Sequence, residues 1–151
     1  LALSLHRRFP RNAVLHAELL EALLRLGRAN EAVIETARIA ERALRGDRNY
    51  GEDLAAIAAI GRARALLIQG EAGEADRLLD AFGDGEPLRP RWAYARVLLV
   101  RAQIRDFQGR RDEAVALYAR VRDYEGPRRS EEAAEEAEIY LEKPFTPPRP
   151  S

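Results

Sequence analysis

The sequence predicts an all-α fold in which antiparallel helix pairs stack into a right-handed superhelix. Apolar residues recur at helical spacing along most of the 151 residues, and no segment shows the alternation typical of a β-strand. Three turns also share the pattern Gly-x-x-x-Glu-Ala, beginning at Gly27, Gly70 and Gly109, roughly 40 residues apart. Repetition at this period is typical of proteins built from stacked structural repeats.

The repeated turn has a physical explanation in each of its residues. A glycine just past a helix end can adopt the left-handed backbone conformation that closes the helix. The glutamate that follows it falls in the first turn of the next helix, where the helix dipole favours negative charge. The alanine lets the two helices approach closely. Because each turn lies between two stretches of helical periodicity, we expect three helical hairpins.

The helices follow in order from caps and breakers. Pro10 ends a helix over residues 1–9, and Asn12 caps the next helix, over residues 13–26. Further helices are expected over residues 30–45, 52–69, 73–81, 91–108, 111–124 and 130–141. Polar loops over residues 46–51 and 83–90 separate the hairpins. We expect Ser130 to cap the last helix and the proline-rich residues 144–151 to form an extended tail.

These elements are expected to form one repeat domain over residues 1–143, followed by the tail over residues 144–151. The parts of the domain are a remnant of an upstream repeat over 1–10, helix pairs over 12–46, 52–87 and 91–126, and a capping helix over 130–142. Glutamates from Glu131 to Glu138 would form the polar outer face of the cap. Its inner face would be Ala133, Ala134, Ala137, Ile139 and Tyr140.

The hairpins resemble the tetratricopeptide repeat, whose pattern is Trp-x2-Leu-Gly-x2-Tyr, then Ala-x3-Phe, then Pro. In the third pair, Ala102 and Ala114 occupy the small-residue positions and Tyr118 the aromatic position. The second pair places Ala63, Ala75 and Leu79 there. The chain departs from the pattern where leucine or tyrosine is usual, with Arg62, Arg101 and Arg105. The resemblance, to a divergent bacterial tetratricopeptide protein, implies a helical solenoid of about three pairs with a partial repeat before them and a cap after them.

The same resemblance implies a non-catalytic scaffold that binds a peptide or partner protein in a concave groove lined by the first helix of each pair. The groove-facing residues expected to contact the partner are Glu21, Arg25, Arg64, Arg96, Gln103 and Phe107. Apolar positions mixed with arginine suit an extended or helical peptide with some acidic character. An alternative is an accessory domain that positions substrate or mediates assembly in a larger enzyme whose catalytic part lies upstream. Self-association through the first-helix face is a third reading.

Composition narrows the functional classes further. Lys plus Arg and Asp plus Glu are both 25, so net charge gives no general attraction to nucleic acid or an anionic membrane. No apolar run approaches the roughly 20 residues that span a bilayer. The chain has no methionine, so we expect it to be the C-terminal part of a longer product, which leaves the compartment open between cytoplasm and periplasm.

Residues for catalysis or metal binding are sparse. With no cysteine, thiolate sites are excluded. The two histidines, His6 and His16, would need a third ligand such as Glu18 or Glu41 to bind a metal. The serines lie near termini or helix caps, without the strand–turn context of a hydrolase nucleophile. We therefore expect no enzyme activity, no cofactor and no metal.

Overall fold

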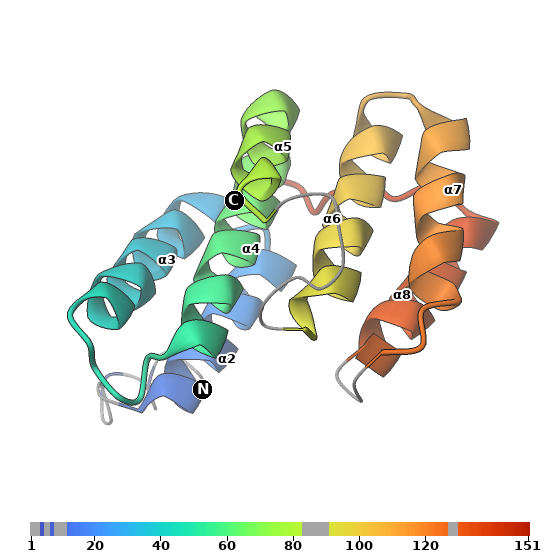
Figure 1. Ribbon diagram of the computed structural model, residues 1–151. Coiled ribbons are helices and arrows are strands. Elements are labelled where there is room, and N and C mark those ends of the chain that lie inside the picture. The colour runs from blue at the N-terminus through green and yellow to red at the C-terminus, as the bar shows by residue number, and fades with distance from the viewer. Residues whose placement is uncertain (1–3, 5–6, 8–11, 83–90, 127–129) are drawn as a thin grey trace. The chain divides into compact units, whose positions relative to one another are not determined.

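The computed structural model describes residues 4, 7, 12–82, 91–126 and 130–151, and every regular element among them is an α-helix (Figure 1). The all-α prediction is confirmed for this part of the chain. The expected helix over residues 1–9 lies outside the described residues except for Ser4 and Arg7, which are both helical. The expected loop over residues 83–90 also lies outside them.

The helices are close to their expected positions. Their bounds are α2 Ala13–Arg25, α3 Ala29–Leu44, α4 Glu52–Ile68, α5 Ala72–Asp80, α6 Ala93–Phe107, α7 Arg111–Arg122 and α8 Ser130–Glu142. Every boundary lies within one helical turn of its expected residue. Asn12 caps α2 as predicted, because its Oδ1 accepts a hydrogen bond from the Leu15 amide at 3.1 Å.

The three repeated turns have the backbone conformation that the sequence predicts. Gly27, Gly70 and Gly109 have φ angles of 72°, 84° and 74°, the left-handed region that glycine adopts without steric cost. The Gly109 amide donates to the Asp106 carbonyl at 3.0 Å, and the amides of the other two glycines bond in the same way. The glutamate of each pattern lies in the first turn of the following helix.

The chain divides into two compact units, here called unit 1 and unit 2. Unit 1 comprises Leu1–Gly70 and Pro148–Ser151, and unit 2 comprises Glu71–Pro147. Unit 1 therefore contains α2, α3 and α4, and unit 2 contains α5 to α8.

In unit 1, α3 packs against both α2 and α4 (Figure 1). Ala32, the alanine of the first repeated turn, is fully buried, as close approach of two helices requires. Gly61 of α4 marks a second close approach, because a Cβ there would lie 2.8 Å from Leu20 Cδ2. The core consists of Leu19, Leu20, Leu23, Leu24, Ala29, Ala32, Ile39, Tyr50, Ala58 and neighbouring residues.

In unit 2, α7 packs against both α6 and α8, while α5 packs against α6. The core unites apolar residues of α6, α7 and α8, among them Leu98, Leu99, Ala102, Ala114, Tyr118, Val121, Ala133 and Ala137. Ala102, Ala114 and Tyr118 are fully buried, so the positions that match the tetratricopeptide pattern are interior positions here.

Two expectations for the last helix are wrong. Ser130 is the first residue of α8 rather than its flanking cap, and its hydroxyl is buried with no hydrogen-bond partner among the described residues. Ile139 is 51% exposed, whereas Ala133 and Ala137 are fully buried. Helical geometry explains the second difference, because residues 133 and 137 share a face that residue 139 does not.

The tail over Pro144–Ser151 has no regular secondary structure, as expected. Phe145 is half-buried and packs against the core of unit 2, and its ring meets Tyr140 edge-on with centroids 5.3 Å apart. Across the described residues, none of the helices combines the length and apolar character needed to cross a membrane.

Candidate partner-binding surface

The six residues expected to contact a partner lie on three helices. Unit 1 holds Glu21 and Arg25 on α2 and Arg64 on α4. Unit 2 holds Arg96, Gln103 and Phe107, all on α6. Each unit thus carries three of the residues.

In unit 1 both arginines contact Glu21. Arg64 donates two hydrogen bonds to the Glu21 carboxylate, from Nη1 at 2.6 Å and from Nη2 at 3.1 Å. Arg25, one helical turn beyond Glu21, donates from Nε at 3.0 Å. Two guanidinium groups therefore share one carboxylate, and the Arg64 pair joins α4 to α2.

The charges around Glu21 change its ionisation. Burial of the carboxylate raises its pKa, but the hydrogen bond and charge of Arg64, and then those of Arg25, outweigh burial and lower the pKa of Glu21 from 4.5 to about 2. Glu21 therefore stays ionised at any physiological pH. Its side chain is 41% exposed and that of Arg64 30% exposed, so a partner in solution can reach both groups.

The exposed part of this surface is mixed in character. Val14 lies on the same face of α2 as Glu21 and Arg25, at helical spacing, and is 67% exposed. Leu67 and Ile68 at the end of α4 are buried, so they pack in the interior rather than forming part of the accessible surface. The accessible surface of unit 1 therefore combines one apolar side chain, that of Val14, with the charged side chains of Glu21, Arg25 and Arg64.

In unit 2, Arg96, Gln103 and Phe107 share one face of α6. Arg96 donates to Glu136 from Nη1 and to Glu132 from Nη2, both at 3.0 Å, and so joins α6 to α8. Gln103 is 6% exposed and lies in the interior, whereas Phe107 at the C-terminal end of α6 is 42% exposed. Arg96 and Phe107 are therefore the residues of this set that a partner can reach directly.

Arg101 and Arg105 of α6 each contact a residue of α5. They occupy positions where the tetratricopeptide pattern has leucine or tyrosine. Arg105 donates to Asp76 Oδ2 at 3.0 Å, and Arg101 donates to the Leu79 carbonyl at 3.1 Å. Their side chains are only 18% and 13% exposed. Both arginines connect α6 to α5, so ion pairs and hydrogen bonds fill positions that apolar contacts fill in the family pattern.

Sequence reasoning missed a buried polar cluster in unit 1. His16, 1% exposed, contacts Glu35 Oε2 through Nε2 at 2.7 Å and the Tyr50 hydroxyl through Nδ1 at 3.0 Å. Arg42 donates to the same hydroxyl at 2.8 Å, and Arg38 donates to the other oxygen of Glu35 at 2.6 Å. A neutral imidazole satisfies both contacts if Nε2–H donates to Glu35 and the tyrosine hydroxyl donates to Nδ1.

The neighbours of His16 differ from the third metal ligands that the sequence suggested. The carboxylate beside His16 belongs to Glu35 rather than to Glu18 or Glu41, and His6 lies outside the described residues. Among the described residues, no group of three or more His, Asp or Glu side chains could hold a metal ion. One signal was readable in the sequence, since Glu35 lies at helical spacing between the apolar residues Ala32 and Ile39.

A histidine–carboxylate pair is also a catalytic arrangement when a substrate can reach it. Here His16 is 1% exposed and Tyr50 is fully buried, so both groups are out of reach of a substrate in this conformation. The geometry fits a polar core that orders the loop carrying Tyr50 against α2 and α3.

A second buried carboxylate, Asp106 in unit 2, was also missed. Its side chain is 1% exposed and accepts hydrogen bonds from Arg111 at 3.0 Å, from the Tyr118 hydroxyl at 2.9 Å and from the Phe145 amide at 2.9 Å. Burial raises the pKa of Tyr118, and the hydrogen bond to Asp106 and its negative charge raise it further. Asp106 therefore holds the start of the tail against α6 and α7.

The described residues form an all-helical protein whose repeated turns contain glycines in the left-handed conformation and whose neighbouring helices are joined by arginine ion pairs. No protein-family model matches the chain. Comparison with curated proteins and with solved structures likewise found no match.

Proposed function

We propose that the chain is a non-catalytic protein-interaction scaffold, a tetratricopeptide-like solenoid that binds a peptide or partner protein on the exposed faces of its first helices, α2, α4 and α6. The observation that carries the proposal is the recurrence of one glycine-closed turn at Gly27, Gly70 and Gly109. A hairpin cannot bury its apolar faces alone, so repeated hairpins stack, and stacking creates extended surfaces for binding.

The accessible residues favour a partner with acidic and apolar groups. Arg25 is 74% exposed, and Arg64 is held by a carboxylate that an acidic partner can replace with its own. Planar guanidinium groups bind carboxylates through two parallel hydrogen bonds. Phe107 adds an exposed aromatic group, a residue type that contributes strongly when an interface covers it.

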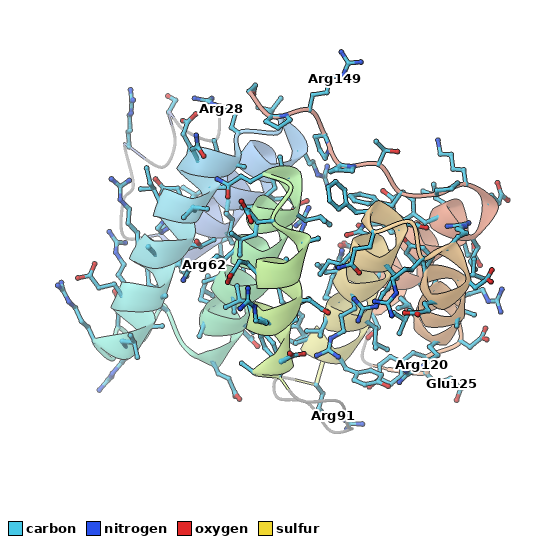
Figure 2. All side chains as sticks on the ribbon, turned by 90° about the horizontal axis from the view of Figure 1, so that it is seen from above. Arg28, Arg62, Arg91, Arg120, Glu125 and Arg149 are labelled. Atoms are coloured by element: carbon cyan, nitrogen blue, oxygen red, sulfur yellow. The ribbon has the colours of Figure 1, made fainter. Side chains whose placement is uncertain are left out.

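The test is selection from a random-peptide phage library, followed by affinity measurements on charge variants. We expect enrichment of peptides that contain acidic residues. The double variant Glu21→Arg with Arg64→Glu exchanges the two charges and keeps an ion pair between α2 and α4. It places a negative charge at position 64, where the wild type has a positive one, so affinity for those peptides should fall. Arg62→Glu is the matched control, because it makes the same charge change on α4 at an exposed position (Figure 2).

The same measurements show which of the two units binds the selected peptides. Peptides that lose affinity in the exchanged pair but not in Phe107→Ala bind unit 1, and the reverse pattern identifies unit 2. If the library yields no enriched peptides, or if the enriched peptides bind all these variants equally well, the proposed surface is wrong.

A further inference from the structure

The last residues of the chain lie against the turn between α2 and α3. The Ser151 amide donates a hydrogen bond to the Gly27 carbonyl oxygen at 3.1 Å, and its hydroxyl donates to the Leu26 carbonyl oxygen at 3.2 Å. Arg149 passes so close that a Cβ added to Gly27 would lie 2.1 Å from the Arg149 carbonyl oxygen. Pro148–Ser151 therefore belong to unit 1, although the rest of that unit ends at Gly70 in the sequence.

The C-terminal end of α2 leaves two carbonyl oxygens free of hydrogen bonds within the helix. The amides of Leu26, Gly27 and Arg28 donate back into the last turn of α2, as expected for a glycine-closed helix end. The carbonyl oxygens of Leu26 and Gly27 lie beyond that network, and the glycine leaves the backbone uncovered by a side chain. Ser151 supplies a donor to each of them.

The tail has the matching chemistry. Pro147, Pro148 and Pro150 restrict the backbone to extended conformations, so little conformational entropy is lost when the segment docks. Pro150 has no amide hydrogen, which makes Ser151 the first backbone donor after Arg149. The Arg149 side chain points away from the helices (Figure 2), so the contact is made through the backbone.

We propose that the α2–α3 turn is a binding site for an extended, proline-containing segment, and that Pro148–Ser151 is its intramolecular ligand. This site is separate from the first-helix surface proposed above for a partner. Gly27 has two roles in it, because its φ of 72° closes α2 and its missing side chain admits Arg149. Gly46 has a similar φ of 76° but nothing within 4 Å of an added Cβ, so it shares only a positive φ with Gly27.

This difference provides a matched pair of variants. Gly27→Ala and Gly46→Ala both place alanine at positive φ in unit 1, yet only the first obstructs the tail. The measurement is the heteronuclear ¹⁵N–¹H Overhauser effect of the Ser151 amide. We expect an ordered amide in the wild type and in Gly46→Ala, and a mobile one in Gly27→Ala. Equal mobility of Ser151 in the wild type and Gly27→Ala, whether ordered or free, overturns the proposal.

A second variant avoids any disturbance of the turn itself. Ser151→Pro removes both donors of residue 151, the amide hydrogen and the hydroxyl, while keeping an extended backbone, so it should release the tail and shift the Gly27 and Arg28 resonances. Arg149→Ala is the control and should leave both unchanged, because that side chain points away from the helices. Because this variant has no amide hydrogen at residue 151, the order of its tail is measured at the Arg149 amide. An Arg149 amide that stays as ordered as in the wild type contradicts the assigned hydrogen bond.

Binding in trans tests whether the turn recognises the segment without the covalent tether. The amidated peptide Thr-Pro-Pro-Arg-Pro-Ser is titrated into a chain that lacks Pro148–Ser151. We expect shift changes centred on Leu26, Gly27 and Arg28, with a dissociation constant of about 1 mM or weaker, since few groups make contact. The same deletion carrying Gly27→Ala should not respond. Failure to see shift changes at about 10 mM peptide, or equal changes in both chains, overturns the assignment of a binding site.

Discussion

At the scale of single residues, His16 shows how a polar side chain comes to lie in the core of unit 1. It is buried, and its two ring nitrogens contact Glu35 and Tyr50. We expect His16→Ala to lower the free energy of unfolding by about 2–4 kcal/mol, because it leaves a cavity and deprives two buried polar groups of a partner. Urea denaturation followed by circular dichroism measures the change.

The control for this variant is Glu18→Ala, which truncates an exposed residue on the same helix. It should change the free energy of unfolding by no more than about 0.5 kcal/mol. Similar small effects in both variants would mean that the buried cluster does not stabilise unit 1.

Asp106 is the corresponding residue of unit 2, where one carboxylate accepts hydrogen bonds from α7 and from the tail. Asp106→Asn removes the charge that compensates Arg111 and one acceptor oxygen. We expect a loss of about 2–3 kcal/mol in the free energy of unfolding, less than for a fully buried ion pair because Arg111 is 32% exposed. Asp112→Asn, an exposed change on α7, serves as the control, and equal losses in the two variants would argue against the assigned role.

Glu21 makes stability depend on pH in a defined direction. Its pKa in the folded chain is about 2, below the ordinary value of 4.5. The stabilisation is therefore fully present above about pH 5 and is lost as the pH falls through the folded-state pKa. Thermal unfolding between about pH 5 and pH 2 should show a steeper loss of stability for the wild type than for Glu21→Gln. Parallel pH profiles for the two proteins would contradict the depressed pKa.

Partners of this kind are hard to predict from sequence because they depend on tertiary packing. His16 and Tyr50 meet only after α2 and the loop before α4 are in place, and Asp106 meets the Phe145 amide only after the tail folds back. The sequence placed Gln103 on an open face, since helical periodicity alone does not distinguish a groove from an interior.

At the scale of elements, the turn at Gly109 offers the cleanest test of how the hairpins close. Its φ is 74° and a Cβ there would meet nothing within 4 Å, so a substitution acts through backbone strain alone. Gly109→Val should destabilise unit 2 by about 1–2 kcal/mol, because a β-branched residue is strongly disfavoured in the left-handed region.

Gly109→Asn is the matched comparison, since asparagine tolerates this conformation better than other side chains. It should cost less than valine in the same urea denaturation experiment. A valine variant as stable as the wild type would show that the glycine conformation does not determine how the hairpin closes.

The boundaries of the helices were largely predictable because the residues that set them lie close to them in the sequence. Asn12, the turn glycines and the first-turn glutamates each act within a few residues of the boundary they set. Ser130 was the exception, because it begins the helix that it was expected to cap. Serine is common on both sides of a helix start, so the sequence could not fix the boundary to one residue.

At the scale of the whole molecule, the sequence predicted helical hairpins but not the contacts that hold them together. Arg101 and Arg105 occupy positions where leucine or tyrosine would have made packing predictable, and they bond instead to α5. A repeat pattern specifies which faces are apolar, whereas ion pairs depend on partners far apart in the sequence. The solenoid arrangement and the extent of a single repeat domain therefore remain predictions.

The position of Trp92 has a consequence for measuring how the molecule unfolds. It is the only tryptophan of the chain and it belongs to unit 2, next to the start of α6. Its fluorescence reports on the surroundings of a residue in unit 2, whereas far-ultraviolet circular dichroism reports on the helices of both units. Comparing the two signals in one titration reveals whether the units lose their structure in a single cooperative transition or one after the other.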